Sequence, residues 1–129
     1  MKKLLFLLLV LSSISCTQTA VQAQSGKLNA AEFESLLSKD KTVQLVDVRT
    51  PEEYAAGHIE GARLIDFYDT DFATRIGKLD KSKPVMVYCA AGGRSASAAE
   101  QLNKMGFKKV YDLTGGMRAW RAAGKKAVQ

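Results

Sequence analysis

The sequence predicts an α/β fold in which a parallel sheet is covered by helices on both faces. Three observations lead to this class. Short apolar runs rich in β-branched residues, at 43–48 and 83–88, alternate with segments whose apolar residues recur at helical spacing. Residues typical of helix starts and ends stand between the two kinds of segment. Strands that alternate with helices along a chain form parallel sheets with both faces buried.

The first strand and the first helix are expected close together. Residues 27–28 give a short strand. Asn29 is a suitable helix N-cap, and Glu32 three positions later completes a pattern typical of a capping box. The helix that follows ends near Asp40 and has one apolar face, formed by Phe33, Leu36 and Leu37.

Two further strands flank a short helix in the middle of the chain. Residues 43–48 are β-branched and mostly apolar, which predicts a buried strand. Thr50 then stands as a helix cap before Pro51, with acidic residues in the first turn, and Gly57 ends this helix. Residues 62–65 predict a short third strand.

The second half of the chain supplies the remaining elements. Residues 67–79 include a loose helical stretch, and residues 83–88 predict the central strand. A helix is expected over 94–105, and Gly106 ends it. The last elements are, in order, a strand over 109–112, a turn at Gly115 and Gly116, and a helix over 117–123.

The first 23 residues are expected to be an export segment that takes no part in the fold. Two lysines precede an unbroken apolar run over 4–11, which is too short to span a bilayer as a helix. Two processing sites remain open. Cys16 resembles the modified cysteine of a bacterial lipoprotein, whereas cleavage after Ala23 would leave a single domain over 24–129. Either way we expect an exported protein, periplasmic or lipid-anchored in the bacterial envelope, whose only membrane contact is that lipid.

Charge and composition exclude some partners. The chain carries 19 basic and 13 acidic residues, a net charge of +6. Basic residues near the C-terminus are spread between apolar residues without aromatic interleaving, so we expect no nucleic acid and only mild attraction of small anions. The chain has one histidine, His58, and no clustered spacing of histidine, cysteine or carboxylate residues. We therefore expect neither a metal nor a cofactor.

Cys89 stands where a strand ends and a glycine-rich loop leads into a helix. The helix N-terminus and the N–H groups of the loop favour negative charge there, and Gly92 and Gly93 let those N–H groups turn inward. Such a setting favours the thiolate, which is the nucleophilic form. The alternative is a buried cysteine that packs as a small hydrophobic residue. If Cys16 is lipidated or removed, Cys89 is the only thiol and no intramolecular disulfide can form.

Three charged residues are expected near this cysteine. Asp47 and Arg49 follow a strand, as Cys89 does, and the carboxyl ends of parallel strands meet at one edge of a sheet. They would orient the loop or a bound donor, or else form a surface ion pair worth at most about 1 kcal/mol. Arg94 stands in the first helical turn, where a cation opposes the helix dipole, so we expect it to close the loop through carbonyls and carboxylates. The alternative is a solvated cation.

Three ordered motifs resemble those of the rhodanese-like sulfurtransferases. Asp47-Val48-Arg49 and the segment 52–62 are similar to the amino-side motif of the family, 87–95 to its active loop, and 113–120 to its carboxyl-terminal signature. The match covers about residues 28–124. The resemblance implies a small α/β domain on a five-stranded, mostly parallel sheet, which we expect to be monomeric.

The resemblance also implies a reaction. From Cys89 to Arg94 the loop spans six residues, one fewer than in the tyrosine phosphatases, so its N–H groups suit a single sulfur anion rather than a phosphate. It implies a persulfide on Cys89, formed from a sulfane donor such as thiosulfate and discharged to a thiol or cyanide. Ala90 departs from the arginine that many active members carry to hold an anionic donor, which leaves the affinity for thiosulfate open. The loop residues of the site are Ala90, Ala91, Gly92, Gly93 and Ser95.

A second function is possible for such a chain, namely a non-catalytic rhodanese-like module that binds a partner or carries sulfur. The intact Cys89, the glycine pair and Arg94 favour the enzyme. His58 is expected to be structural rather than a catalytic base, because it follows Gly57 in a motif that serves as scaffold in the family. Trp120 is expected to pack in the core or near the loop without a chemical role.

Overall fold

The computed structural model describes residues 25–129. The expected export segment, with Cys16 and the cleavage position after Ala23, lies outside the described residues. Five strands alternate with five helices, which in chain order are β1 (Gly26–Leu28), α1 (Ala30–Lys39), β2 (Gln44–Asp47), α2 (Pro51–Ala55), β3 (Arg63–Leu64), α3 (Phe72–Gly77), β4 (Val85–Tyr88), α4 (Gly93–Lys104), β5 (Val110–Leu113) and α5 (Gly116–Ala122).

The five strands form one sheet in the order β1-β5-β4-β2-β3. Every neighbouring pair in this sheet is parallel, so the predicted α/β class is confirmed and the sheet is all-parallel rather than mostly parallel. The only antiparallel pairing among the described residues is an isolated bridge between His58 and Val128, outside the strands. All five strands therefore direct their carboxyl ends to the same edge of the sheet.

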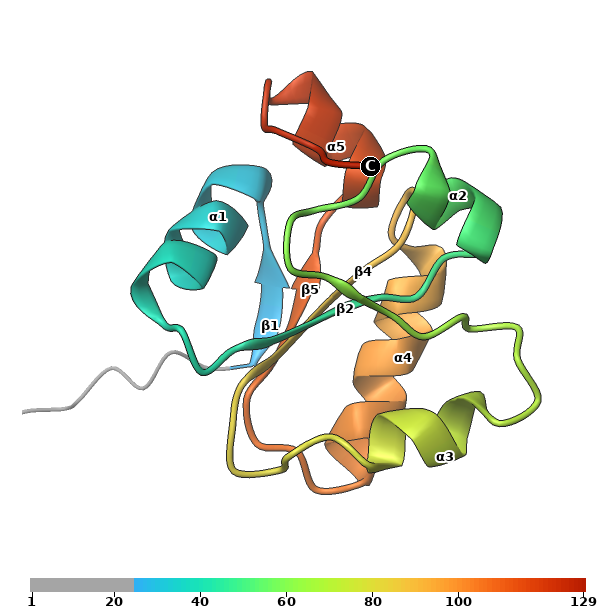
Figure 1. Ribbon diagram of the computed structural model, residues 1–129. Helices are drawn as coiled ribbons and strands as arrows, with labels where there is room; N and C mark the ends of the chain where they lie inside the picture. Colours follow the sequence, from blue (N-terminus) through green and yellow to red (C-terminus); the bar gives the residue numbers. More distant parts are fainter. Residues whose placement is uncertain (1–24) are drawn as a thin grey trace, which may run out of the picture.

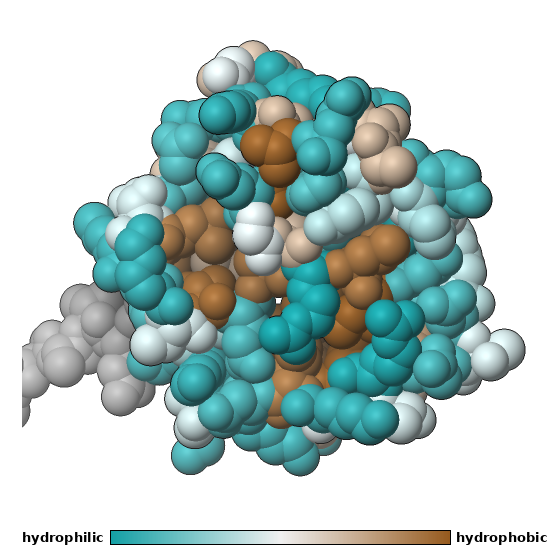
Figure 2. Space-filling view, viewed as in Figure 1, coloured by the Kyte–Doolittle hydropathy of each residue, from teal (hydrophilic) through white to brown (hydrophobic). Residues whose placement is uncertain are grey.

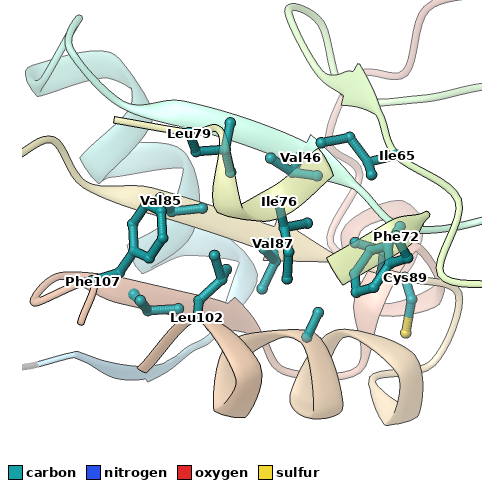
Figure 3. Close-up of a cluster of buried hydrophobic side chains, with 13 residues drawn as sticks. Val46, Ile65, Phe72, Ile76, Leu79, Val85, Val87, Cys89, Leu102 and Phe107 are labelled. Atoms are coloured by element: carbon teal, nitrogen blue, oxygen red, sulfur yellow. The ribbon is translucent and has the colours of Figure 1, made fainter. Parts of the chain in front are cut away.

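Helices cover both faces of the sheet (Figure 1). Residues along the buried strands alternate between the two faces, as the pleat requires. In β4, Val85 and Val87 pack beneath α3 and α4, whereas Met86 and Tyr88 pack beneath α1 and α5. Cys89 continues the alternation onto the α4 face, and Figure 3 shows its sulfur at one end of that hydrophobic cluster, beside Phe72.

Local capping accounts for the starts of the first two helices. Asn29 and Glu32 form the expected capping box of α1, with both hydrogen bonds at 2.9 Å. Thr50 caps α2 and forms a second capping box with Glu53. These reciprocal bonds satisfy N–H groups that the first helical turn leaves without partners.

One predicted element is confirmed and one differs from the structure. The helical stretch expected within 67–79 is α3, and an Asp66 carboxylate oxygen, which accepts the N–H of Tyr68 at 2.9 Å, holds the residues before it in a turn. Gly115 and Gly116 are not simply a turn. Gly115 caps α5 with φ 73°, and Gly116 is the first residue of that helix.

The surface is mainly polar on the face drawn in Figure 2, where hydrophilic residues surround smaller apolar patches. Tyr68 is the one large hydrophobic side chain that is well exposed among residues 25–129, with 68% of its surface accessible. In the same range no helix is long and apolar enough to cross a membrane.

Candidate functional site

The candidate site lies at the carboxyl edge of the sheet, where β4 leads through Cys89 into α4. The loop turns sharply at Gly92, whose φ of 114° lies in the left-handed region that glycine tolerates best. Gly93 begins α4, one residue earlier than the sequence predicted. The loop therefore joins the carboxyl end of the central strand to the amino end of a twelve-residue helix.

The sulfur of Cys89 is buried and hydrogen-bonded by its own loop. The residue is 1% exposed. The N–H of Gly92 lies 3.0 Å from Sγ, and the hydroxyl of Ser95 lies 3.4 Å from it. Burial raises the pKa of the Cys89 thiol, but hydrogen bonds lower the pKa by more, so that it lies below its ordinary value; the donors are Ser95, through its hydroxyl and its N–H, and the N–H groups of Gly92 and Ala91. The hydrogen-bond donors around this sulfur therefore favour the thiolate over the thiol.

The first turn of α5 holds the loop from its other side. The N–H of Met117 donates to the carbonyl oxygen of Cys89 at 2.8 Å, and the N–H of Arg118 donates to that of Ala90 at 3.0 Å. Gly116 makes this approach possible, because a Cβ there would overlap the carbonyl oxygen of Cys89 and stand 2.8 Å from the carbonyl carbon of Ala90. The carboxyl-terminal signature motif thus serves to brace the loop.

Arg94 binds a carboxylate from another element. Its Nη1 lies 2.9 Å from Oε2 of Glu53 and its Nη2 lies 3.1 Å from Oε1. Within residues 25–129 the hydrogen bonds of this guanidinium go to Glu53 alone, so the expected bonds to loop carbonyls are absent. The hydrogen bond to Arg94 holds the pKa of Glu53 below its usual value. The Tyr68 ring covers the guanidinium at 5.5 Å.

Asp47 and Arg49 form a buried ion pair, so the alternative of a surface pair is wrong. Asp47 is fully buried, Arg49 is 3% exposed, and Nη2 of Arg49 lies 2.7 Å from Oδ2 of Asp47. Arg49 also donates to the carbonyl oxygen of Gly57 at 2.8 Å and lies over the ring of Tyr88 at 5.6 Å. These contacts hold the end of α2 against the sheet. They do not involve the Cys89 loop directly.

His58 and Trp120 have structural surroundings. The His58 ring stacks on Tyr54 with centroids 3.7 Å apart, and its Nδ1 lies 3.0 Å from the carbonyl oxygen of Tyr54. Trp120 is 3% exposed and makes an edge contact with Phe33 in the core. Among the described residues, neither side chain hydrogen-bonds to Cys89.

An open pocket of about 420 Å³ lies beside the loop. Cys89 itself is not part of its wall, but the neighbouring Ala90 is. Its lining is rich in arginine and consists of Arg49, Glu53, Ala56, Ala90, Met117, Arg118 and Arg121. The pocket therefore presents a positively charged surface beside Ala90, the residue that follows Cys89.

Sequence reasoning missed Glu53 and the two α5 arginines as site residues. Glu53 and Arg94 are 41 positions apart, so no local pattern joins them. Arg118 was visible only as part of a signature motif, and nothing in the sequence shows that α5 turns its arginines toward Ala90. Among the described residues, no group of three or more histidine, cysteine or carboxylate side chains is placed to hold a metal.

Comparison with known proteins places these observations in a family. A family model described as a rhodanese-like domain matches residues 29–123. The chain is 41% identical over 85 residues to a protein of Pseudomonas paraeruginosa named thiosulfate sulfurtransferase GlpE, which is 65% of this chain and 74% of that protein.

Solved structures agree with this relationship. A crystal structure of a rhodanese-related protein from Thermoplasma volcanium superimposes with a TM-score of 0.70 at 30% identity, covering 79% of this chain and 96% of that one. A rhodanese-like domain protein from Staphylococcus aureus gives a TM-score of 0.65 at 35% identity, over 74% of this chain and 90% of the other.

Proposed function

Because the chain belongs to the rhodanese-like domain family, we propose that it is a sulfurtransferase. It moves a sulfane sulfur from a donor such as thiosulfate to a thiophilic acceptor through a persulfide on Cys89. The observation that carries the proposal is the thiol itself, which is buried, hydrogen-bonded by Gly92 and Ser95, and lowered in pKa. A relative named thiosulfate sulfurtransferase at 41% identity supports the same reaction.

The first half-reaction is a displacement at sulfur. The Cys89 thiolate attacks the outer sulfur of thiosulfate, an S–S bond forms to Cys89, and the bond to the sulfonate sulfur breaks. Its electron pair leaves with sulfite. One negative charge remains on the outer sulfur of the persulfide, and sulfite carries the other two, so charge and atoms balance. Two half-reactions through a covalent intermediate give ping-pong kinetics.

The loop can stabilise the charged persulfide without a side-chain base. N–H groups at the loop and at the amino end of α4 are already oriented before sulfur arrives, and preorganised donors of this kind act strongly where water is excluded. In the second half-reaction a thiolate or cyanide attacks the outer sulfur and takes it away. The electron pair of the broken S–S bond returns to Cys89 as the thiolate.

A non-catalytic module that binds a partner or only carries sulfur is the alternative. A module that only binds a partner would not need the Cys89 pKa to be lowered or two separate elements, α4 and α5, to hold one six-residue loop. Both features support sulfur chemistry at Cys89, and repeated turnover distinguishes the enzyme from a sulfur carrier. The experiment below is designed to exclude this non-catalytic module.

The decisive experiment is intact mass spectrometry of the protein after incubation with thiosulfate. We expect a gain of one sulfur atom, its loss on addition of cyanide, and release of thiocyanate over many cycles. Cys89→Ser should show none of these. Persulfide formation without repeated turnover would support the carrier module, and no mass gain with any sulfane donor would overturn the proposal. Hydrolysis of aryl phosphates that depends on Cys89 would indicate a phosphatase instead.

We also propose that the protein is exported, on the basis of the leader-like sequence before residue 24. Mass spectrometry of the protein from bacterial cells should find either a lipid on Cys16 or a mature chain that begins at Gln24. An unprocessed chain that begins at Met1 would contradict export.

A further inference from the structure

The pocket beside the loop contains more positive charge than its ion pairs neutralise. Arg49 is paired with Asp47, and Arg94 at the edge of the site is paired with Glu53. The other two arginines of the lining, Arg118 and Arg121, are exposed, and within residues 25–129 neither guanidinium has an ion-pair or hydrogen-bond partner. Two arginines without partners in a small pocket form a site for an anion.

A backbone hydrogen bond fixes the position of Arg118, and helical spacing and a close approach to Gly57 locate Arg121. The N–H of Arg118 donates to the carbonyl oxygen of Ala90 at 3.0 Å, so the Arg118 backbone is in direct contact with the residue that follows the nucleophile. Arg121 is three positions further along α5, which places it on the same side of the helix. Its Nη2 lies 3.0 Å from the point where a Cβ of Gly57 would be. One arginine thus lies next to the loop, and the other lies over the end of α2.

The position of Ala90 explains what these arginines supply. Ala90 forms part of the pocket wall but carries no charge. Arg118, whose N–H is hydrogen-bonded to the Ala90 carbonyl oxygen, supplies a charged side chain next to it. Thiosulfate presents three oxygens and two charges, and its sulfite leaving group keeps both charges. A planar guanidinium donates two parallel hydrogen bonds to such oxygens. A volume of about 420 Å³ is within the range of small-molecule sites.

We propose that Arg118 and Arg121 bind the oxyanion end of the sulfane donor and make the enzyme selective for donors with a sulfonate group. The inference rests on the proposed sulfurtransferase function. The donor places its outer sulfur at Cys89 and its sulfonate oxygens in the arginine-lined pocket. The charge for donor recognition then comes from α5 instead of the loop.

The test compares two donors in single-turnover persulfidation of Cys89, measured by intact mass. Thiosulfate carries sulfonate oxygens, whereas inorganic disulfide, HS2⁻, delivers sulfur without any oxygen. Arg118→Ala and Arg121→Ala should each lower the second-order rate constant for thiosulfate about tenfold, mainly by raising the half-saturating thiosulfate concentration, as expected for lost hydrogen bonds to a charged group. The same variants should change the rate with inorganic disulfide less than about threefold, because that donor makes no oxyanion contact.

Matched controls separate recognition from net charge and from folding. Arg63→Ala removes an exposed arginine outside the pocket and should leave both rates unchanged. Arg118→Lys with Arg121→Lys should recover part of the loss, because charge is kept and the fork geometry is not. Circular dichroism and thermal unfolding check that each variant is folded.

The outcomes distinguish this inference from the function on which it rests. Equal loss with both donors, or no loss with thiosulfate, would overturn the assignment of the two arginines while leaving the sulfurtransferase in place. If Cys89 of the unaltered protein accepts sulfur from neither donor, the proposed function fails, and the inference fails with it. A selective loss with thiosulfate supports both.

Discussion

The Arg94 guanidinium, from the first turn of α4, binds the Glu53 carboxylate of α2 through two hydrogen bonds, both within 3.1 Å. The Oε2 atom of Glu53 also accepts the N–H of Thr50, so one carboxylate caps α2 and binds the first turn of α4. The side chains are 17% and 37% exposed, which leaves the pair only partly shielded from solvent. The bond therefore connects the cysteine loop to α2.

Loss of Arg94 should impair sulfur transfer more than loss of Glu53. Arg94→Ala removes a positive charge close to the persulfide and loosens the loop, so we expect a decrease of about two to three orders of magnitude, the range seen when one preorganised donor is removed. Glu53→Gln keeps the guanidinium and one acceptor oxygen, and should cost about tenfold or less. Single-turnover persulfidation measures both. An Arg94→Ala variant with unaltered rate would show that the arginine is only a scaffold.

His58 should affect stability rather than chemistry. His58→Ala removes the stack on Tyr54 and the contact with the Tyr54 carbonyl, which together contribute on the order of 1–2 kcal/mol to the free energy of unfolding. His58→Phe keeps the stack and should recover part of the loss. Urea unfolding measures the stability, and persulfidation of the folded variants measures the chemistry. If folded His58→Ala were as inactive as Cys89→Ser, a cysteine–histidine mechanism would replace the one proposed here.

Local signals in the sequence predicted the succession of strands and helices along the chain well, because these signals act over a few residues. Cys89 was predicted between a strand and a helix, and the structure places it there. The cap at Asn29 followed from the same kind of signal. Each depends on backbone geometry that neighbouring residues determine.

Contacts between elements that lie far apart in the sequence could not be predicted from local signals. Glu53 was visible as an acidic residue in a first helical turn, yet its bond to Arg94 depends on how α2 and α4 are placed. Asp47 and Arg49 were expected near the site, but their burial depends on the helices that cover that face. Such pairs arise only when the sheet has assembled.

Asp112 should make the protein less stable at neutral pH. It is 4% exposed, and its Oδ1 is the one buried side-chain oxygen or nitrogen without a hydrogen-bond partner in the described part of the chain. Burial raises the pKa of Asp112, while Ser95 and Lys27 oppose the rise. Because the folded pKa lies above the unfolded value, folding favours the protonated form. The contribution of Asp112 to stability is therefore greatest at acidic pH and falls as pH rises through the folded pKa.

Asp112→Asn removes the charge and nearly keeps the shape. It should raise the free energy of unfolding at pH 7 by about 1–2 kcal/mol, the cost of an unsatisfied buried polar group, and the gain should shrink as pH falls toward 4. Urea unfolding over this pH range checks the result. Asp71→Asn, at an exposed position, should change stability by less than about 0.5 kcal/mol. A stability gain that does not depend on pH would contradict the charge argument.

Ser95 should set the pH dependence of persulfide formation. Its hydroxyl lies 3.4 Å from the Cys89 sulfur, and its hydroxyl and N–H are the leading causes that lower the thiol pKa against the effect of burial. The rate with thiosulfate depends on the thiolate, so it should rise with pH and reach half its plateau below 9.0, the ordinary value of the thiol. Ser95→Ala removes the hydroxyl but keeps the N–H, and should move this midpoint to higher pH.

The shift in midpoint identifies an effect on the thiolate, because general damage to the loop would lower the plateau instead. At pH values below the midpoint Ser95→Ala should therefore be slower than the unaltered protein, and at pH values well above it the two rates should converge. Ser97→Ala, the same substitution on the exposed side of α4, should leave the profile unchanged. The ultraviolet absorbance of the thiolate would follow the same ionisation without a donor. An unshifted midpoint in Ser95→Ala would show that the backbone N–H groups alone hold the thiolate.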